Sequence, residues 1–179
     1  KLLYFLMLCA TMKANKPYHL ICVIYPERTM DNIDIKILNL LKQNARMSAS
    51  EIGEKINLSV SAVLERIKKL EKSGIIKQYT LILDPKLINK DVSAFISIGL
   101  DHPKYNESFI ESVLDHKQIV ECHYITGDSD FLLKAVIDST ASLEKVLNDI
   151  KSIQGVSRTR TLVVLSTVKN EYTVLPDTL

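Results

Sequence analysis

Long hydrophobic runs and cysteine pairs are missing from this sequence. No apolar run reaches the ~18 residues that a membrane-spanning helix needs, so a membrane protein is not expected. Cys9, Cys22 and Cys122 lie far apart and form no CxxC pair, which argues against a disulfide framework. A reduced, cytoplasmic setting is the expectation that follows.

Catalytic and cofactor motifs are also missing. The chain has no Ser/His/Asp order typical of hydrolases, no phosphate-binding loop and no dinucleotide fingerprint. Cys122 and His123 are adjacent, but neighbouring residues of a strand point to opposite faces and cannot easily share an ion. We therefore expect no catalytic residue, no metal site and no cofactor, and we do not expect an enzyme.

The net charge of +2 is too small to predict a polyanionic partner, but its distribution is uneven. Residues 31–83 carry nine Lys/Arg against six Asp/Glu, whereas residues 92–179 carry eight against twelve. Residues 31–83 therefore carry the excess of positive charge that a nucleic-acid-binding segment needs.

The chain is organised around residues 48–74, which predict two short helices joined by a tight turn. Ser48 and Glu51 form a capping box that starts the first helix, which ends near Ile56. Ser59 is the N-cap of the second helix, and Gly74 follows its C-terminus. Apolar residues at helical spacing predict the buried stripe of the second helix: Val60, Val63, Leu64, Ile67 and Leu70.

The polar residues of this pair point to a helix-turn-helix that binds double-stranded DNA. Small residues at the start of the second helix can enter the major groove, where Ser59 and Ser61 would meet base edges or phosphates. Cations further along would grip phosphates. The alternative is the solvated, lysine-rich face of an ordinary helix hairpin. The DNA-binding candidates are Ser48, Ser59, Ser61, Ala62, Glu65, Arg66, Lys68 and Lys69.

Flanking segments complete a first domain over residues 30–83. Residues 31–43 predict an amphipathic third helix, and residues 75–83 predict a linking strand that makes the domain winged. Residues 84–91 are the expected linker. Residues 1–29 differ in character; we expect Met30 to be the natural start, with the preceding residues an extension that is foreign to the native protein or disordered, and an additional packed element is the alternative.

The second domain, residues 92–179, predicts the element order β-α-β-β-α-β of a ferredoxin-like fold. The fold class is therefore α+β, with an N-terminal three-helix winged helix-turn-helix. One face of the antiparallel sheet would stay uncovered although it carries apolar groups, so we expect a second subunit to cover it. The expected elements are strands over 92–100, 119–126, 131–137 and 156–168, with helices over 106–114 and around 143–150.

The turn between two of these strands is a candidate ligand site. An amino acid needs acceptors for its ammonium group and donors for its carboxylate, and aspartates, hydroxyls and glycine-flanked N–H groups supply both. The alternative is a hairpin turn with no further role. The effector-binding candidates are Thr126, Gly127, Asp128, Ser129 and Asp130.

From Asp31 to Lys169 the sequence resembles the Lrp/AsnC (leucine-responsive, feast/famine) family of transcription regulators. The resemblance rests on the order and spacing of the stretches Asp34-x-Lys36-Ile37-Leu38, Leu58-Ser59-x-Ser61-x-Val63-x-x-Arg66-Ile67-Lys68-Lys69-Leu70-Glu71-x-x-Gly74-Ile75-Ile76, Thr126-Gly127-Asp128-x-Asp130-Phe131-Leu132-Leu133, Gly155-Val156 and Val168-Lys169. Gly53 stands where the family usually has alanine, which would weaken the first helix by ~1 kcal/mol, and Asn89 replaces a customary glycine. Ser129 stands where a larger residue is common, so the ligand cannot be carried over.

The resemblance implies a sequence-specific regulator that forms homodimers and often octamers. It also implies control by a small effector, most often an amino acid, bound between dimers near residues 127–130. Two other readings remain open. One is an enzyme similar to siroheme decarboxylases, which share this architecture, and the other is an architectural DNA-binding protein that needs no ligand.

Overall fold

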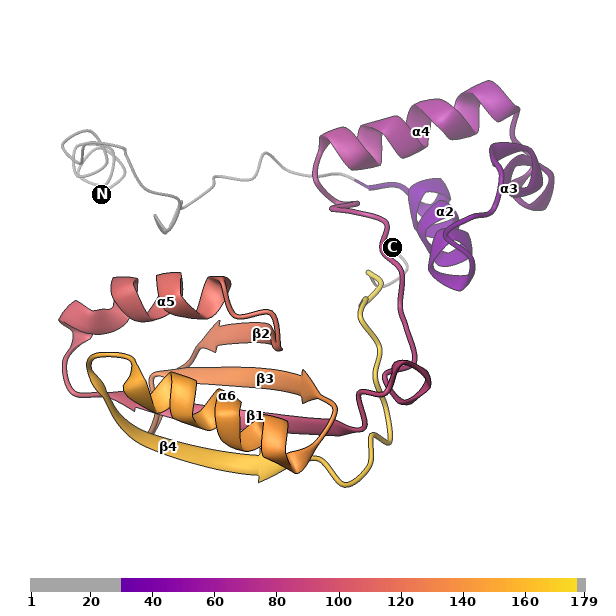
Figure 1. The fold of residues 1–179 in the computed structure, drawn as a ribbon. Coiled ribbons are helices and arrows are strands. Elements are labelled where there is room, and N and C mark those ends of the chain that lie inside the picture. The colour runs from indigo at the N-terminus through magenta and orange to yellow at the C-terminus, as the bar shows by residue number, and fades with distance from the viewer. Residues whose placement is uncertain (1–29, 177–179) are drawn as a thin grey trace, which may run out of the picture. The chain divides into compact units, whose positions relative to one another are not determined.

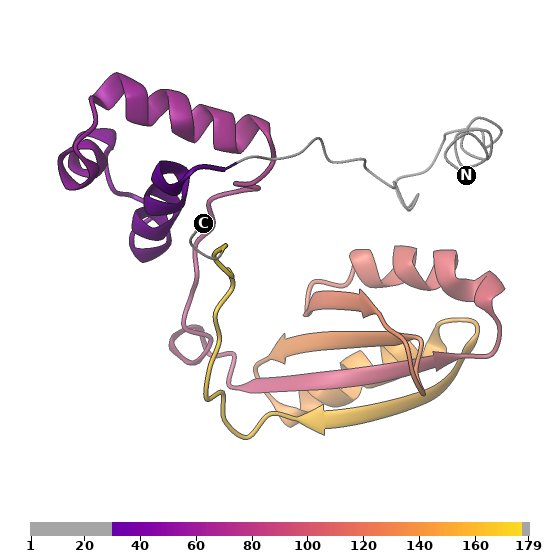
Figure 2. The same cartoon turned by 180° about the vertical axis from the view of Figure 1, so that it is seen from behind.

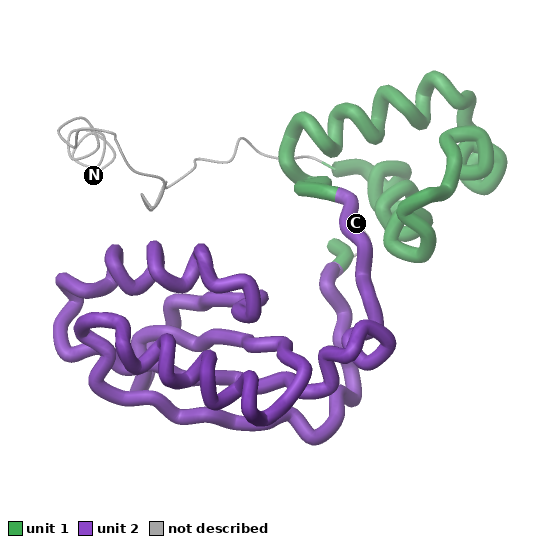
Figure 3. Tube along the Cα trace, viewed as in Figure 1, with its two compact units in different colours: residues 1–78, 175–179 green, residues 79–174 purple. Residues whose placement is uncertain are grey.

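The computed structural model of the protein describes residues 30–176, which divide into two compact units (Figure 3). The first unit comprises residues 30–78 with 175–176, and the second comprises residues 79–174. The expectations for residues 1–29 concern a segment outside the described range. The linker expected over residues 84–91 stays a prediction.

The first unit contains three helices, α2 (Asn32–Gln43), α3 (Ala49–Ile56) and α4 (Val60–Lys72) (Figure 1). Each one begins at a polar N-cap, because a side-chain oxygen accepts from the backbone N–H groups that the first turn leaves unpaired. Asp31 forms a capping box with Asp34, and Ser48 forms one with Glu51. Ser59 caps α4 by its own side chain, without a capping box. The helix starts predicted at Ser48 and Ser59 are confirmed.

The core of this unit is formed by apolar residues from all three helices. Its buried members are Ile37, Leu41, Ile52, Val63 and Leu70. The predicted stripe of α4 was wrong at two positions, because Val60 and Leu64 keep 47% and 45% of their surface exposed. The other two helices cover only the side of α4 that carries Val63 and Leu70. Val60 and Leu64 lie in the next row around the helix and stay outside the core.

The turn between α3 and α4 requires a close approach of the backbone. Asn57 ends α3 in the left-handed conformation, with φ 56°, and the Leu58 N–H donates to the Gly53 carbonyl at 3.0 Å. A Cβ on Gly53 would lie 2.5 Å from the Leu58 carbonyl oxygen. Gly53 therefore allows the tight turn. From the sequence alone, only the cost of this glycine to helix stability is expected.

The strand expected over residues 75–83 does not form within the described chain. A strand needs a partner backbone for its N–H and C=O groups, and no β ladder includes these residues. Gly74 ends α4 as predicted, with φ 73°. Beyond it, Leu81 and Leu83 are 79% and 53% exposed.

The second unit is a four-stranded antiparallel sheet in the order β2-β3-β1-β4 with two helices. Along the chain its elements are η1 (Lys86–Ile88), β1 (Val92–Leu100), η2 (Pro103–Tyr105), α5 (Asn106–Leu114), β2 (Ile119–Tyr124), β3 (Phe131–Ile137), α6 (Thr140–Ser152) and β4 (Val156–Val163). The predicted βαββαβ order is confirmed. Asn89, where the family usually has glycine, lies in the left-handed region at φ 56°, a conformation that asparagine tolerates.

Helices α5 and α6 pack on the same face of the sheet, and Figure 2 shows the sheet from the side away from α6. Alternation along β1 and β3 turns one set of side chains into the core, including Ala94, Ile96, Ile98, Phe131 and Leu133. The opposite set, which includes Phe95 and Leu132, is only half-buried. The last strand ends at Val163 rather than 168, because β1 begins at Val92 and its pairing with β4 runs out near this point.

No helix within residues 30–176 has the length and hydrophobicity needed to cross a membrane.

Gly53→Ala is expected to lower the free energy of unfolding of the first unit by about 1–3 kcal/mol. The added methyl meets a backbone carbonyl, and this clash exceeds the gain of about 1 kcal/mol in helix propensity. Urea denaturation followed at the amide signals of α3 and α4 measures the effect. Glu54→Ala, at an exposed position of α3, is the control and should change stability little; a stabilised Gly53→Ala variant would contradict the close contact.

Candidate functional site

The start of α4 holds its serines in a small hydrogen-bonded group. The Ser59 hydroxyl accepts from the Ala62 N–H at 3.3 Å and lies 3.1 Å from the Ser61 hydroxyl. Capping therefore occupies Ser59, whereas Ser61 points outward with its hydroxyl shared only with this neighbour. Ser48 is similarly engaged by Glu51, whose carboxylate accepts from both its N–H and its hydroxyl.

The exposed side of α4 carries most of the residues singled out from the sequence. Ser61, Glu65, Lys68 and Lys69 are all exposed, while Ala62 is half-buried. The structure thus brings the small polar entry residue and the lysines onto one surface of the helix.

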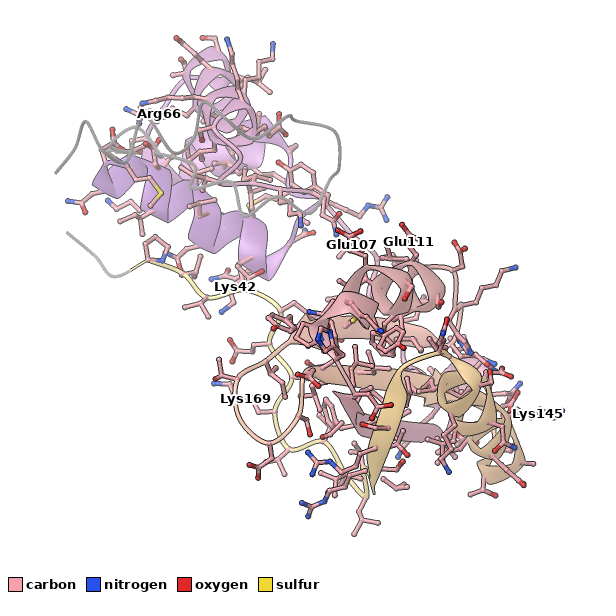
Figure 4. The ribbon with its side chains drawn as sticks, turned by 90° about the vertical axis from the view of Figure 1, so that its left-hand side faces the viewer. Lys42, Arg66, Glu107, Glu111, Lys145 and Lys169 are labelled. Carbon is pink, nitrogen blue, oxygen red and sulfur yellow. The ribbon has the colours of Figure 1, made fainter. Side chains whose placement is uncertain are left out.

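Arg66, for which a phosphate contact is expected, forms two ion pairs within its own unit. Its Nη1 lies 2.7 Å from Asp31 Oδ2 and 2.8 Å from Asp34 Oδ1, so it ties α4 to the start of α2. Arg66 is labelled in Figure 4. The Asp34 side chain is only 2% exposed. A buried carboxylate needs a cationic partner, and the Nη1 atom of Arg66 supplies it.

The same contacts shift the titration of Asp31. The Asp34 backbone N–H, followed by the Arg66 guanidinium, lowers the pKa of the Asp31 carboxyl. The Glu51 carboxyl has a lowered pKa as well, chiefly because the Ser48 N–H donates to it. Ionised carboxylates are therefore part of how α2 and α3 begin.

In the second unit, Asp130 fixes the turn of residues 126–130 against β1. Its carboxylate accepts from the Leu100 N–H at 2.7 Å, and its own N–H donates to the Ile98 carbonyl at 2.8 Å. One of its carboxylate oxygens is thus used by the fold. Gly127 has φ 121°, which glycine adopts readily, and the side chain of Asp128 is exposed.

Arg158 joins this turn and was missed by sequence reasoning. It is the third residue of β4, opposite Gly99 of β1, and its Nη2 donates to the Asp128 carbonyl. The register of β1 with β4 brings it there, because the start of β4 pairs with the end of β1. The alternation of residues 156–163 signalled a strand, but only the sheet order places Arg158 beside the turn.

Other titratable groups of the second unit do not converge on a site. Glu121 pairs with Lys134 at 2.8 Å and lies 3.4 Å from His123, and the hydrogen bond from Lys134 lowers the pKa of its carboxyl. Burial raises the pKa of the Cys122 thiol. Within residues 30–176, no group of three His, Cys, Asp or Glu side chains is arranged to hold a metal ion.

Sequence comparisons identify relatives across both units. The Lrp/AsnC ligand binding domain matches residues 93–174, and a winged helix-turn-helix DNA-binding domain matches residues 30–77. The leucine-responsive regulatory protein of Haemophilus influenzae is 37% identical over 145 residues, which span 79% of this chain and 87% of that protein. The chain belongs to the Lrp/AsnC family. The leucine-responsive regulatory protein of Escherichia coli K12 is 35% identical over 147 residues, or 80% of this chain and 90% of that protein.

Solved structures of Lrp/AsnC regulators show the same architecture. AsnC of E. coli superposes with a TM-score of 0.78 at 30% identity, covering 83% of this chain and 99% of that one. A transcriptional regulator of Neisseria meningitidis, solved in complex with L-Met, gives a TM-score of 0.78 at 33% identity and covers 82% of this chain and 96% of that one. With DNA-binding and ligand-binding domains in one chain, the protein is an effector-responsive transcription regulator.

Arg66→Ala should destabilise the first unit by about 1–3 kcal/mol, because it leaves the buried Asp34 carboxylate without its partner. Lys68→Ala, at an exposed position of the same helix, should leave stability nearly unchanged. It should weaken DNA binding on all sequences and reduce the slope of log K against log salt by about one. Urea denaturation and DNA titrations over a range of salt separate the two effects; equal stability of both variants would contradict the assignment of Arg66.

Stability of the first unit should fall in acid. The folded-state pKa of Asp31 is lowered from its usual value of about 3.9, so the ionised form favours folding. This contribution is present above about pH 4 and is lost as the pH falls through the folded-state pKa. Amide hydrogen exchange of α2 and α4 against pH measures it. Asp31→Asn should flatten the dependence, and an unchanged dependence in this variant would exclude Asp31 as the group responsible.

Proposed function

We propose that the effector of this Lrp/AsnC regulator is an amino acid bound at the corner formed by residues 126–130, the end of β1 and Arg158. The observation that carries the proposal is the contact of the Arg158 guanidinium with the backbone of Asp128, a residue whose own carboxylate is exposed. Arg158 reaches the Asp128 carbonyl, and the exposed Asp128 carboxylate belongs to the same residue. These two groups complement the carboxylate and the ammonium of a zwitterion.

The fixed position of Asp130 supports this corner as a binding site. Its bond to the Leu100 N–H holds the turn in place, so little ordering is required when a ligand binds. Thr126, Gly127 and Ser129 line the same turn and add hydroxyl and N–H donors. Asp130 then acts by positioning, while Asp128 is the ammonium acceptor. The L-Met complex of the Neisseria relative is consistent with an amino-acid ligand.

We further propose a homodimer that assembles into a higher oligomer, with an octamer as the expected form. Apolar residues exposed in the single chain support it. The uncovered sheet face carries half-buried Phe95, Leu132 and Val136 with Leu162 at 51% exposure. Tyr79, Leu81, Ile82, Leu83, Leu87 and Ile88 add a second exposed apolar segment. A second copy would cover both surfaces, and its backbone would pair with residues 75–83.

For DNA, we propose that α4 enters the major groove from its N-terminus, with Ser61 and Glu65 near base edges and Lys68 and Lys69 on phosphates. Two such helices in a dimer would read half-sites about one or two helical turns apart, ~10 bp each. Ser48, Ser59 and Ala62 then support the helix start rather than read bases. With DNA as partner, we infer a cytoplasmic protein, and we infer that it is not an enzyme.

A thermal-shift screen of the twenty amino acids, followed by light scattering, tests the effector proposal. One amino acid should stabilise the protein and change its oligomeric state. Arg158→Ala and Asp128→Asn should each weaken that binding roughly 10–100-fold, as expected for the loss of a charge-assisted hydrogen bond. Lys151→Ala removes an exposed charge from α6 and is the matched control.

Two results would count against the proposal. If a stabilising amino acid binds the Arg158 and Asp128 variants with unchanged affinity, the site lies elsewhere. If no amino acid binds, the effector is of another class. Absorbance with added tetrapyrrole tests the enzyme alternative, and DNA affinity that hardly depends on sequence would favour the architectural one.

A further inference from the structure

The first turns of α4 expose apolar side chains next to polar ones. Val60 and Leu64, 47% and 45% exposed, stand four residues apart and therefore lie in one row along the helix. Lys68 continues the same row, and Ser61 and Glu65 form the row beside it. The leading end of the helix thus presents a mixed surface rather than the small polar one that the sequence suggested.

The fold of the first unit gives this pair no packing role. Neither residue belongs to the hydrophobic core of the unit or to the partly buried residues packed against that core. Single exposed apolar residues are ordinary on protein surfaces. These two, however, adjoin each other at the end of the helix that a helix-turn-helix inserts first into the major groove.

Hydrogen-bonding capacity at this end of α4 is small. The Ser59 hydroxyl already accepts from the Ala62 N–H, and Ser61 shares its hydroxyl with Ser59. Ser61 and Glu65 are the polar groups left to meet base edges, and the exposed surface beside them is apolar. The one apolar group that base edges present in the major groove is the C5-methyl group of thymine.

We propose that Val60 and Leu64 contact thymine methyl groups, so that each half-site of the operator contains thymines at fixed positions opposite the start of α4. Side chains four apart on a helix have Cβ atoms about 5–6 Å from each other, and bases stack about 3.4 Å apart. The two methyl groups therefore belong to base pairs one or two steps apart. The inference rests on the DNA-binding function and adds the class of sequence that is read.

The test replaces thymine by uracil, which removes the methyl group and leaves base pairing and phosphates unchanged. An operator is first enriched from random duplex DNA with the full-length protein, and each thymine in it is then changed singly. At the contacted positions, loss of one buried methyl should weaken binding about fourfold. An operator with 5-methylcytosine·G in place of such a T·A pair should bind the protein more tightly than an operator with C·G at the same place.

Protein variants connect each methyl group to its side chain. Leu64→Ala should abolish the uracil penalty at one position and preserve it at the other, and Val60→Ala should do the reverse. Lys68→Ala is the matched control, because it should weaken thymine and uracil operators equally. Both apolar residues are exposed, so their truncation should leave the thermal midpoint nearly unchanged, which is checked on the same samples.

The uracil penalties and the two alanine variants together decide whether the thymine contacts exist. An enriched operator without any uracil penalty, or with penalties that both alanine variants retain, would overturn the thymine readout and leave the DNA-binding function intact. Failure to enrich any sequence would overturn sequence-specific binding itself. Penalties that disappear one by one with the matching variant would establish the contacts.

Discussion

The pairing of Arg66 with the buried Asp34 carboxylate is the interaction on which the geometry of the first unit depends. Asp34 lies at the start of α2, where it also accepts from the Asp31 N–H, and Arg66 reaches it from the middle of α4. The cost of burying an unpaired charge is large. The pair therefore fixes how α4 crosses α2, and this crossing decides which side of α4 faces outward.

A comparable device operates in the second unit. There the Asp130 carboxylate accepts from the backbone of Leu100, 30 residues earlier in the chain, and holds the turn against the end of β1. In both units a residue that looked available for a partner molecule is used to place its neighbours. Lys68 and Lys69 are exposed on α4, and Asp128 lies beside Arg158 at the sheet corner, on the elements that these two interactions place.

Local features could be predicted from the sequence, and features that depend on distant partners could not. The caps at Ser48 and Ser59 involve residues three positions apart. The positions of the strands along the chain follow from the alternation of apolar and polar residues over a few positions. The burial of Val60 and Leu64 depends on which helix lies across from them, and the role of Arg66 depends on residues 32 and 35 positions earlier. Arg158 became part of the corner only through the register of β1 with β4. The strand expected over residues 75–83 finds no partner strand within residues 30–176.

The exposed segment after α4 has a consequence for gene dosage. Its leucines are exposed, with Leu81 at 79%, and its backbone joins no β ladder within the described part of the chain. A lone chain therefore carries a segment that is prone to aggregation and proteolysis. A second copy, as proposed, would protect it by mass action. Below the dissociation constant of such a dimer, the paired population falls with the square of the total protein. Halving the amount of the chain would then leave about a quarter of the protected dimer. A lower expression level would therefore reduce both the occupancy of DNA and the lifetime of the protein itself.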